Sequence, residues 1–421
     1  MKTHTCLYPL VFMILLAACN YQQSEKEGLT EIDLGKAMEN LTEISVSQLG
    51  EKIRYIPLQT TDSSVVGKES VVRLMNNRLI VASHRQPLRM FDKETGRFIR
   101  NIGRIGQGPN EYGYGTSVPV FWVDEAAGII YVKGWEKRIA RFDAEGNPLG
   151  DYELPEGYGD AKVGEIQSIA HDNQMFNYRK SIYTGAPLTL FSCDISSGKV
   201  TEIISKESEV KIVPADIQTI EVFKGDFLGI PGSSGCLAIQ MKDGRRIIDY
   251  MEVPGVWGHK GEVRFKESFN DTIFTVSNDK LRPEILFNLG KWHCPYDQRF
   301  DQEGSEQRID INYLIEGEQS IYFIFRTNYF QLSKENLYCG VFDKRSGVTY
   351  AMKSAPLKND ITRLVPFTLL TGSNSGTLVG LCEAADVVEW LDKNLSVGES
   401  PEKALLEGVG EEDNPVVVLI D

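Results

Sequence analysis

Residues 103–112 (GRIGQGPNEY) bring together side chains that can bind a ligand: a guanidinium, an amide, a carboxylate and a phenol. The residues that carry these groups are Arg104, Gln107, Glu111 and Tyr112. The glycine spacing matches neither GxGxxG nor GxxxxGK(S/T), and no helical pattern follows Pro109, so a phosphate-binding loop is not indicated. Two interpretations stay open. The side chains line a ligand-binding mouth, or they form a salt-bridged brace between neighbouring elements.

The sequence carries no recognisable catalytic or metal-binding signature. Its five histidines are far apart, and neither HExxH nor GxSxG occurs. Residues 143–147 (DAEGN) begin like a calcium loop, but no glutamate stands at the twelfth position that an EF-hand needs. We therefore predict no catalytic residue, no metal and no cofactor. The pattern favours a protein that is not an enzyme and leaves the question open, with Glu111 as the first residue to mutate if it is one.

Aromatic side chains offer a second kind of binding chemistry, because they can stack on sugar rings. Four tryptophans lie in or beside expected strands and loops: Trp122, Trp135, Trp257 and Trp292. Packing between strands is the commoner use of such residues. Tyr112 and Tyr114, in the glycine-rich segment, are the aromatic residues that we most expect to be exposed.

The N-terminus has the pattern of an export signal. Lys2 supplies a basic start, and the apolar residues 7–16 are too few to span a bilayer as a stable helix. Leu16-Ala-Ala-Cys19 resembles the lipobox of bacterial lipoproteins, whose cysteine receives acyl chains such as palmitate; a plain secretory signal is the alternative. We expect a signal peptide over residues 1–18, a lipidated polar tether over 19–30 and one folded domain over 31–421.

Lipidation of Cys19 would place the protein in the cell envelope, with the membrane as its first partner. No other segment reaches transmembrane length, and more than one acyl chain gives stable attachment. Because Asn20 follows the cysteine where aspartate would signal inner-membrane retention, we predict the outer membrane, on its periplasmic or surface face. The formal net charge of −14 and the lack of a basic cluster argue against nucleic acid as a partner.

The elements that must position these residues are strands. From Ile53 onward, runs of four to seven apolar and aromatic residues alternate with turn signals. An Asp, two or three residues and a Gly recur after such runs at aspartates 92, 143 and 343, with weaker copies at Asp194 and at Asp243, where the Gly follows directly. Asp caps a turn and Gly supplies its positive φ. A period near 50 residues predicts an all-β propeller; unrelated hairpins of a sandwich are the alternative.

The same period gives six to seven blades between Ile53 and Asp421. We expect residues 54–58 to pair with strands from the C-terminal end, which would close the ring and remove open edges. Short helices are predicted near residues 34–40 and 383–395, the second with a 3.6-residue apolar repeat. Beyond Cys19 the five cysteines show no disulfide or zinc spacing, so we expect free, buried thiols.

Three segments resemble the six-bladed β-propeller lipoproteins of Bacteroides and relatives. They are residues 55–61 (YIPLQTT), residues 98–112 (FIRNIGRIGQGPNEY), and the pair 270–274 (NDTIF) and 412–419 (EDNPVVVL). Their order covers essentially the whole mature chain. The resemblance implies six blades, with seven less expected, and implies little about activity.

Three functions stay open at this point. The first is a non-catalytic propeller, tethered to a membrane, that binds a protein or glycan ligand. The second is an accessory subunit of an outer-membrane uptake assembly. The third is a hydrolase or lyase acting on glycans or peptides, with its site at the propeller mouth.

Overall fold

The computed structural model describes residues 28–113, 118–135, 137–155, 165–180, 188–206, 212–223, 236–250, 255–331, 336–396 and 398–421. Cys19, the expected signal peptide and Tyr114 lie outside the described residues. In the described part of the chain no helix is long and apolar enough to cross a membrane.

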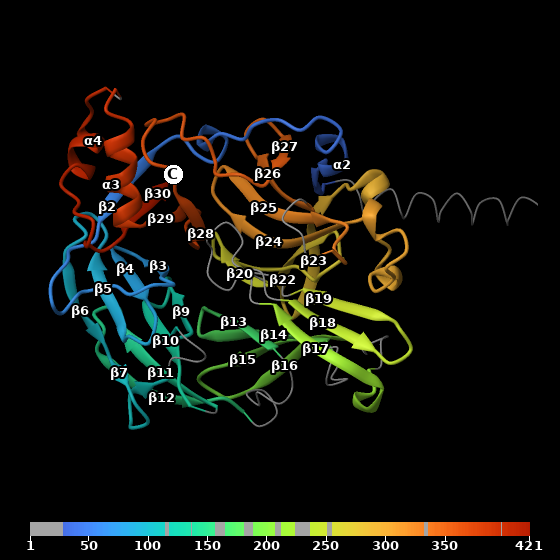
Figure 1. Cartoon of the computed structure of the whole chain (residues 1–421). Coiled ribbons are helices and arrows are strands. Elements are labelled where there is room, and N and C mark those ends of the chain that lie inside the picture. Colours follow the sequence, from blue (N-terminus) through green and yellow to red (C-terminus); the bar gives the residue numbers. More distant parts are fainter. Residues whose placement is uncertain are drawn as a thin grey trace, which may run out of the picture.

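Within these residues, seven sheets of three to five strands follow one another along the chain (Figure 1). The first four sheets contain β3 (Val71–Met75), β4 (Arg78–Ala82), β5 (Leu88–Asp92) and β6 (Phe98–Ile102); β9 (Phe121–Asp124), β10 (Ile129–Lys133), β11 (Arg138–Asp143) and β12 (Pro148–Glu153); β13 (Glu165–His171), β14 (Gln174–Lys180), β15 (Leu188–Asp194) and β16 (Val200–Lys206); and β17 (Ile217–Phe223), β18 (Cys236–Met241) and β19 (Arg246–Tyr250). Consecutive strands of each sheet are antiparallel neighbours.

Two of the last three sheets take up a strand from the N-terminal segment. They contain β20 (Val256–His259), β21 (Glu262–Phe265), β22 (Thr272–Ser277) and β23 (Lys280–Phe287) with β1 (Thr30–Ile32); β24 (Ile309–Glu316), β25 (Ser320–Thr327), β26 (Leu337–Asp343) and β27 (Val348–Lys353); and β28 (Thr368–Gly372), β29 (Leu378–Cys382) and β30 (Val416–Ile420) with β2 (Ile53–Pro57). The strand β1 begins at Thr30, the last residue of the expected tether.

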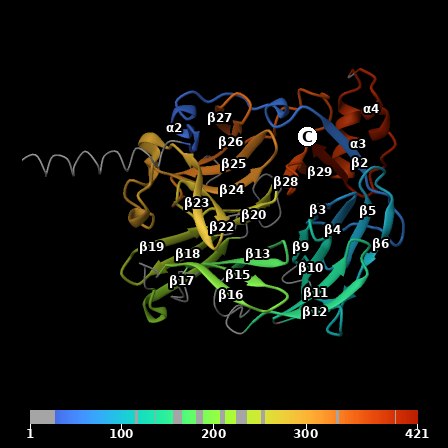
Figure 2. The same cartoon turned by 180° about the vertical axis from the view of Figure 1, so that it is seen from behind.

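The sheets pack face to face around a common centre, as the two opposite views in Figures 1 and 2 show. Hydrophobic cores join β28–β30 to β3–β6, β3–β6 to β9–β12, and β9–β12 to β13–β16. Further cores join β13–β16 to β20–β23, then β20–β23 to β24–β27, and finally β24–β27 back to β28–β30. The arrangement is a closed ring of radial sheets, which is a β-propeller.

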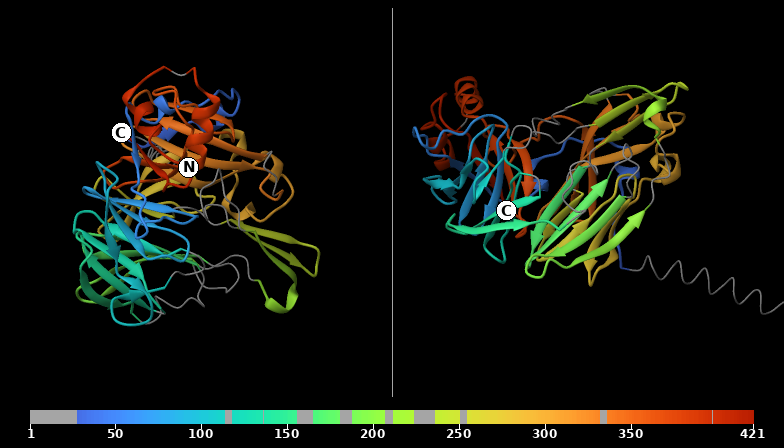
Figure 3. Two further views of the ribbon diagram at one scale, coloured as in Figure 1. Left: turned by 60° about the vertical axis from the view of Figure 1, so that its left-hand side comes forward. Right: turned by 90° about the horizontal axis from the view of Figure 1, so that it is seen from below.

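The sheet β17–β19 stands outside this succession. The strand β13 contacts β20 directly, and Tyr178 packs edge-on against Phe265 at 5.1 Å between ring centroids, so no sheet separates β13–β16 from β20–β23. The residues of β18 and β19 pack instead on the segment around Cys294 and Tyr329. Figure 3 shows β17–β19 projecting from the ring.

The two ends of the ring meet in one sheet, as the sequence predicts. The strand β2 pairs antiparallel with β30, from Ile53 opposite Ile420 to Pro57 opposite Val416. The unbroken apolar run of β30 follows from its place between two other sheets, which cover both of its faces. Val418 packs towards β24–β27, whereas Val417 packs towards β3–β6.

The aspartate motif lies where the sequence places it, in the hairpin between the third and fourth strands of a blade. The backbone N–H of Thr95 donates to Asp92 at 2.9 Å, and that of Ser197 donates to Asp194 at 2.7 Å. Gly96 and Gly198 supply φ values of +69° and +68°. Since Asp243 stands in the β18–β19 turn, it is not a degraded copy of a ring repeat.

In the blade β20–β23, other residues form the hairpin between the third and fourth strands. Its outer hairpin uses Asn278 and Asp279 at φ of +50° and +58°, a two-residue turn without glycine. Asparagine and aspartate are the residues besides glycine that best tolerate this region. The period near 50 is therefore hidden in this blade.

Helices are few and short among the described residues. They are α2 (Leu34–Ala37), α3 (Ala384–Lys393) and α4 (Pro401–Leu406), with 3-10 turns at Val46–Gln48, Pro214–Asp216, Gly290–Trp292, Tyr296–Gln298 and Ser305–Gln307. The predictions near residues 34–40 and 383–395 are confirmed by α2 and α3. The free cysteines are buried, as expected: Cys193, Cys236, Cys294, Cys339 and Cys382.

Candidate functional site

Residues 103–112 form a compact crossing between two blades. The short strands β7 (Arg104–Ile105) and β8 (Glu111–Tyr112) pair in parallel, which places Arg104 opposite Glu111. The Glu111 carboxylate accepts a hydrogen bond from the Gly108 N–H at 2.7 Å and another from the Arg104 guanidinium. These two bonds lower the pKa of Glu111, so its charge is held within the loop.

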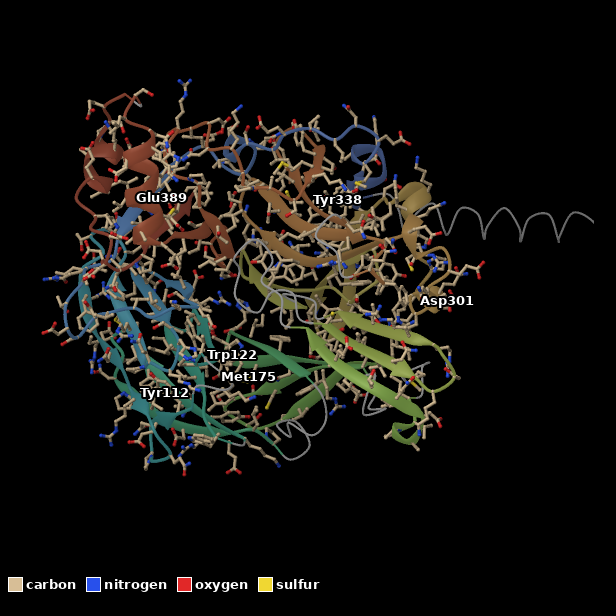
Figure 4. The ribbon with its side chains drawn as sticks, viewed as in Figure 1. Tyr112, Trp122, Met175, Asp301, Tyr338 and Glu389 are labelled. Carbon is tan, nitrogen blue, oxygen red and sulfur yellow. The ribbon has the colours of Figure 1, made fainter. Side chains whose placement is uncertain are left out.

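Tyr112 is wholly buried, so the expectation that it faces a ligand is wrong. Its hydroxyl donates to the Ile102 carbonyl at 2.5 Å and accepts from the Leu88 N–H at 2.8 Å. Its ring meets Phe142 edge-on, and Figure 4 shows it farther from the centre of the ring than Trp122. Gly103 adopts a φ of +57° and allows the Phe142 ring to come close, because a Cβ at this position would lie 2.6 Å from Phe142.

Neighbouring side chains bind the backbone of the same loop. The Trp135 indole N–H donates to the Gly106 carbonyl at 2.7 Å, and Arg138 donates to the Gln107 carbonyl at 3.0 Å. This is the geometry of a brace, and it holds Glu111 and Tyr112 by internal bonds. The side chains of Arg104 and Gln107 are exposed, and their contact with a ligand stays a prediction.

The turn between β28 and β29 crosses the centre of the ring on one face. The Asn374 N–H donates to Glu125 at 2.8 Å, and the Lys260 N–H donates to the Asn374 carbonyl at 2.6 Å. Glu125 and Lys260 stand in the β9–β10 and β20–β21 turns, in blades that are not neighbours of β28–β30. The three turns therefore meet across the axis of the ring.

A buried charge cluster lies between β20–β23 and β24–β27. The Glu316 carboxylate accepts from the Trp257 indole at 3.0 Å and from Lys344 at 3.0 Å. His259 Nε2 lies 3.5 Å from it. Burial opposes ionisation of Glu316, but Lys344, His259 and Arg264 outweigh it, so the pKa of Glu316 lies below its ordinary value. Burial lowers the pKa of His259 to about 4.

This cluster does not present its reactive groups to a substrate. The side chains of His259 and Glu316 are 3% and 1% exposed. A perturbed pKa marks a functional site only where a substrate can reach the group. The Glu316 carboxylate therefore joins two blades, because it accepts from Trp257 of one and from Lys344 of the other.

A groove of about 400 Å³ opens between α3 and the segment that leads into β28. One wall is apolar, with Pro356, Val365, Pro366 and Phe367. The other wall is a face of α3 that carries Asp386, Glu389, Trp390 and Lys393. Leu381 and Cys382 of β29 and Thr368 of β28 complete the lining. This size is typical of a small-ligand pocket.

The helix α3 separates its residues between core and groove. Ala384 and Val387 are buried in the core shared by β24–β27 and β28–β30. The groove residues recur at i, i+3, i+4 and i+7 from Asp386, so they stack along one side of the helix. Figure 4 labels Glu389 on this helix.

The aromatic part of the groove depends on a glycine. A Cβ on Gly380 would lie 2.9 Å from the Phe367 ring and 2.9 Å from the Thr368 carbonyl. Gly380 therefore lets Phe367 lie on β29 and still border the groove. Trp390 is half-buried on the opposite wall.

The groove has a negative field. Burial raises the pKa values of Cys382 and Glu383, and the charge of Asp386 raises both further. Lys393 is paired with Glu389 one helical turn away, and this pairing lowers the pKa of Glu389. No ion pair of Asp386 occurs among the described residues.

Comparison with known proteins places this ring in a family. The model described as "Domain of unknown function (DUF4934)" matches residues 29–421. The chain belongs to the DUF4934 family. No curated protein matches the sequence.

Three solved structures can be compared with this DUF4934 member, and the first of them shares its fold. The "Putative exported protein" of Bacteroides fragilis is 19% identical, with a TM-score of 0.58 over 93% of this chain and 98% of that chain. The Swd1 β-propeller domain of Myceliophteria thermophila is 12% identical, with a TM-score of 0.34 over 73% and 95%. The Dos1 propeller is 13% identical, with a TM-score of 0.30 over 79% and 70%.

The tryptophans singled out from the sequence serve mainly in packing. Trp257 is buried, Trp122 and Trp292 pack against blade cores, and Trp135 is 48% exposed but bound to the brace. The sequence reasoning missed Trp390. A signal was available: Trp390 stands at the border between the apolar and charged faces of the helix, where it packs on the core and still faces outward.

Proposed function

We propose that this protein is a non-catalytic binding propeller of the cell envelope, and that its ligand occupies the groove between α3 and β28–β29. The observation that carries the proposal is the face of α3, which turns Trp390 and two carboxylates towards a cavity. Trp390 packs with part of its surface on the core shared by β24–β27 and β28–β30, and a ligand would cover the part that borders the groove.

A non-catalytic role fits the state of the polar groups. Glu389 is kept ionised by Lys393, which suits attraction of a ligand better than donation of a proton. The buried cluster around Glu316 is closed to substrate, and Glu111 is engaged in the brace. These observations favour binding over hydrolysis.

We further infer a six-bladed propeller, with β17–β19 as an insertion. Support comes from the cores that pass directly from β13–β16 to β20–β23, together with the closure of the ring by β2 and β30. The insertion follows the third blade and is anchored on the fifth and sixth sheets.

The proposed location is the outer membrane, through acyl chains on Cys19. The apolar N-terminal run and the Leu-Ala-Ala-Cys sequence support export and lipidation. The similar Bacteroides fragilis structure carries a description as exported. Growth with labelled palmitate tests this point: label on the full chain but not on Cys19→Ser is expected, and label on both contradicts it.

Binding in the groove is tested by thermal unfolding of the full chain against a panel of amines, oligosaccharides and peptides. A ligand that raises the unfolding midpoint of the unaltered chain should also raise that of Trp135→Ala. The same ligand should leave Trp390→Ala unchanged. A rise that persists in Trp390→Ala, or is lost only in Trp135→Ala, contradicts the proposal.

A further inference from the structure

We infer that the groove takes a small organic cation, an ammonium or guanidinium group carried on an apolar chain. The inference rests on the proposed function, because it assumes that the groove is the binding site. It adds the chemical class of the ligand.

First, the hydrogen-bonding groups of the groove match those of an ammonium. Carboxylates accept and do not donate, and an ammonium donates and does not accept. The charged groups among the lining residues are Asp386 and the ion pair of Glu389 with Lys393, so the carboxylate of Asp386 is the acceptor left for a ligand. A ligand rich in donors therefore fits better than one rich in acceptors.

Second, the charged groups of the groove stand on one of its two walls. The charged side chains stand on α3, and the facing wall consists of proline, valine and phenylalanine. A sugar carries hydroxyls around its ring and would bury some of them against this wall without partners, which costs free energy. An alkylammonium is polar at one end, so its chain can lie on the apolar wall.

The third argument is the pairing of aromatic rings with a negative field. Trp390 and Phe367 border the same cavity as Asp386, whose charge raises the pKa values of Cys382 and Glu383. Tryptophan is the aromatic side chain that attracts cations most strongly, and a carboxylate beside it adds to the attraction. The formal net charge of −14 acts in the same sense over longer distances.

Calorimetric titration of the full chain with phenethylammonium and with its neutral analogue 2-phenylethanol tests the inference. The ammonium should bind about tenfold more tightly than the alcohol, and added salt should weaken its binding. Asp386→Asn, which keeps shape and removes the charge, should weaken ammonium binding by about threefold to tenfold. Asp392→Asn removes the same charge from an exposed position of α3 outside the groove lining, and should change binding little.

The outcomes separate the inference from the proposed function. Equal affinity for the ammonium and the alcohol, or equal effects of Asp386→Asn and Asp392→Asn, overturns the cation inference and leaves a neutral-ligand groove. Binding of methyl β-glucoside in place of the ammonium, lost in Trp390→Ala, has the same meaning. If neither these probes nor the wider panel binds in a way that depends on Trp390, both proposals fail.

Discussion

The brace at residues 103–112 and the groove beside α3 contain the same kinds of side chain and use them differently. Each has a tryptophan, a carboxylate and a basic residue. In the brace, Trp135 and Glu111 are bound to the backbone of the loop itself. In the groove, Trp390 and Asp386 face a cavity, and no side-chain hydrogen bond of either occurs among the described residues. A binding site is thus indicated by the groups that the fold leaves unengaged.

The largest loss of stability is expected when the brace at residues 103–112 is broken. Replacing Tyr112 by alanine should lower the free energy of unfolding by about 3–5 kcal/mol, because it removes a buried ring and the bond between its hydroxyl and Ile102. Urea unfolding measures this value. Trp390→Ala, at a half-buried position, should cost less than half as much. Equal costs would mean that the two regions do not differ as described.

The buried cluster around Glu316 sharpens the comparison, because the Glu316 carboxylate is also engaged internally, by Trp257 and Lys344. The pKa of His259 falls from its ordinary 6.5 to about 4 on folding. The unfolded chain therefore binds more protons between these values, and stability should fall by about 3 kcal/mol as the pH drops from about 6.5 to about 4. The lowered pKa of Glu316 adds a further loss at still lower pH.

Unfolding measured across this pH range, for the unaltered chain and His259→Gln, checks the prediction. The variant should lose most of the slope between pH 6.5 and 4, whatever its absolute stability. An unchanged slope in His259→Gln would assign the acid sensitivity to other groups.

A smaller effect is expected when the groove is narrowed. Alanine at Gly380 would press on the Phe367 ring and the Thr368 carbonyl, at a cost of about 1–3 kcal/mol. Displacement of Phe367 should also weaken phenethylammonium binding severalfold, as measured by calorimetry. Gly398→Ala is the matched control, since nothing lies within 4 Å of its added Cβ. Equal binding by the two variants would remove Phe367 from the site.

Features set by local chemistry could be predicted from the sequence. The Asp-to-Gly turns at Asp92 and Asp194 and the apolar face of α3 follow from turn preference and periodicity. The pairing of β2 with β30 follows instead from the need to close the ring. The same turn chemistry gave a wrong expectation at Asp243. This aspartate makes the same kind of turn, but in a sheet outside the ring. The Asn278–Asp279 turn hid a true repeat, because it reaches positive φ without glycine.

The candidate site was harder to predict because it depends on distant contacts. Glycines around Tyr112 suggested an exposed loop, but Gly103 serves the close approach of Phe142 and Tyr112. Trp390 borders the groove together with Phe367 and Pro356, which lie there only because of the packing of the last blade. Gly380 leaves the space that Phe367 occupies. No residue spacing in the sequence predicts that these side chains line one groove.

The most direct test of the account follows Trp390 and Trp135 together. The chain has five tryptophans, so the full chain labelled with 5-fluorotryptophan should give assignable fluorine resonances with the help of single Trp→Phe variants. On titration with phenethylammonium, the Trp390 resonance should shift and saturate while that of Trp135 stays in place. A shift of Trp135 with Trp390 unmoved would contradict the assignment of the ligand to the groove.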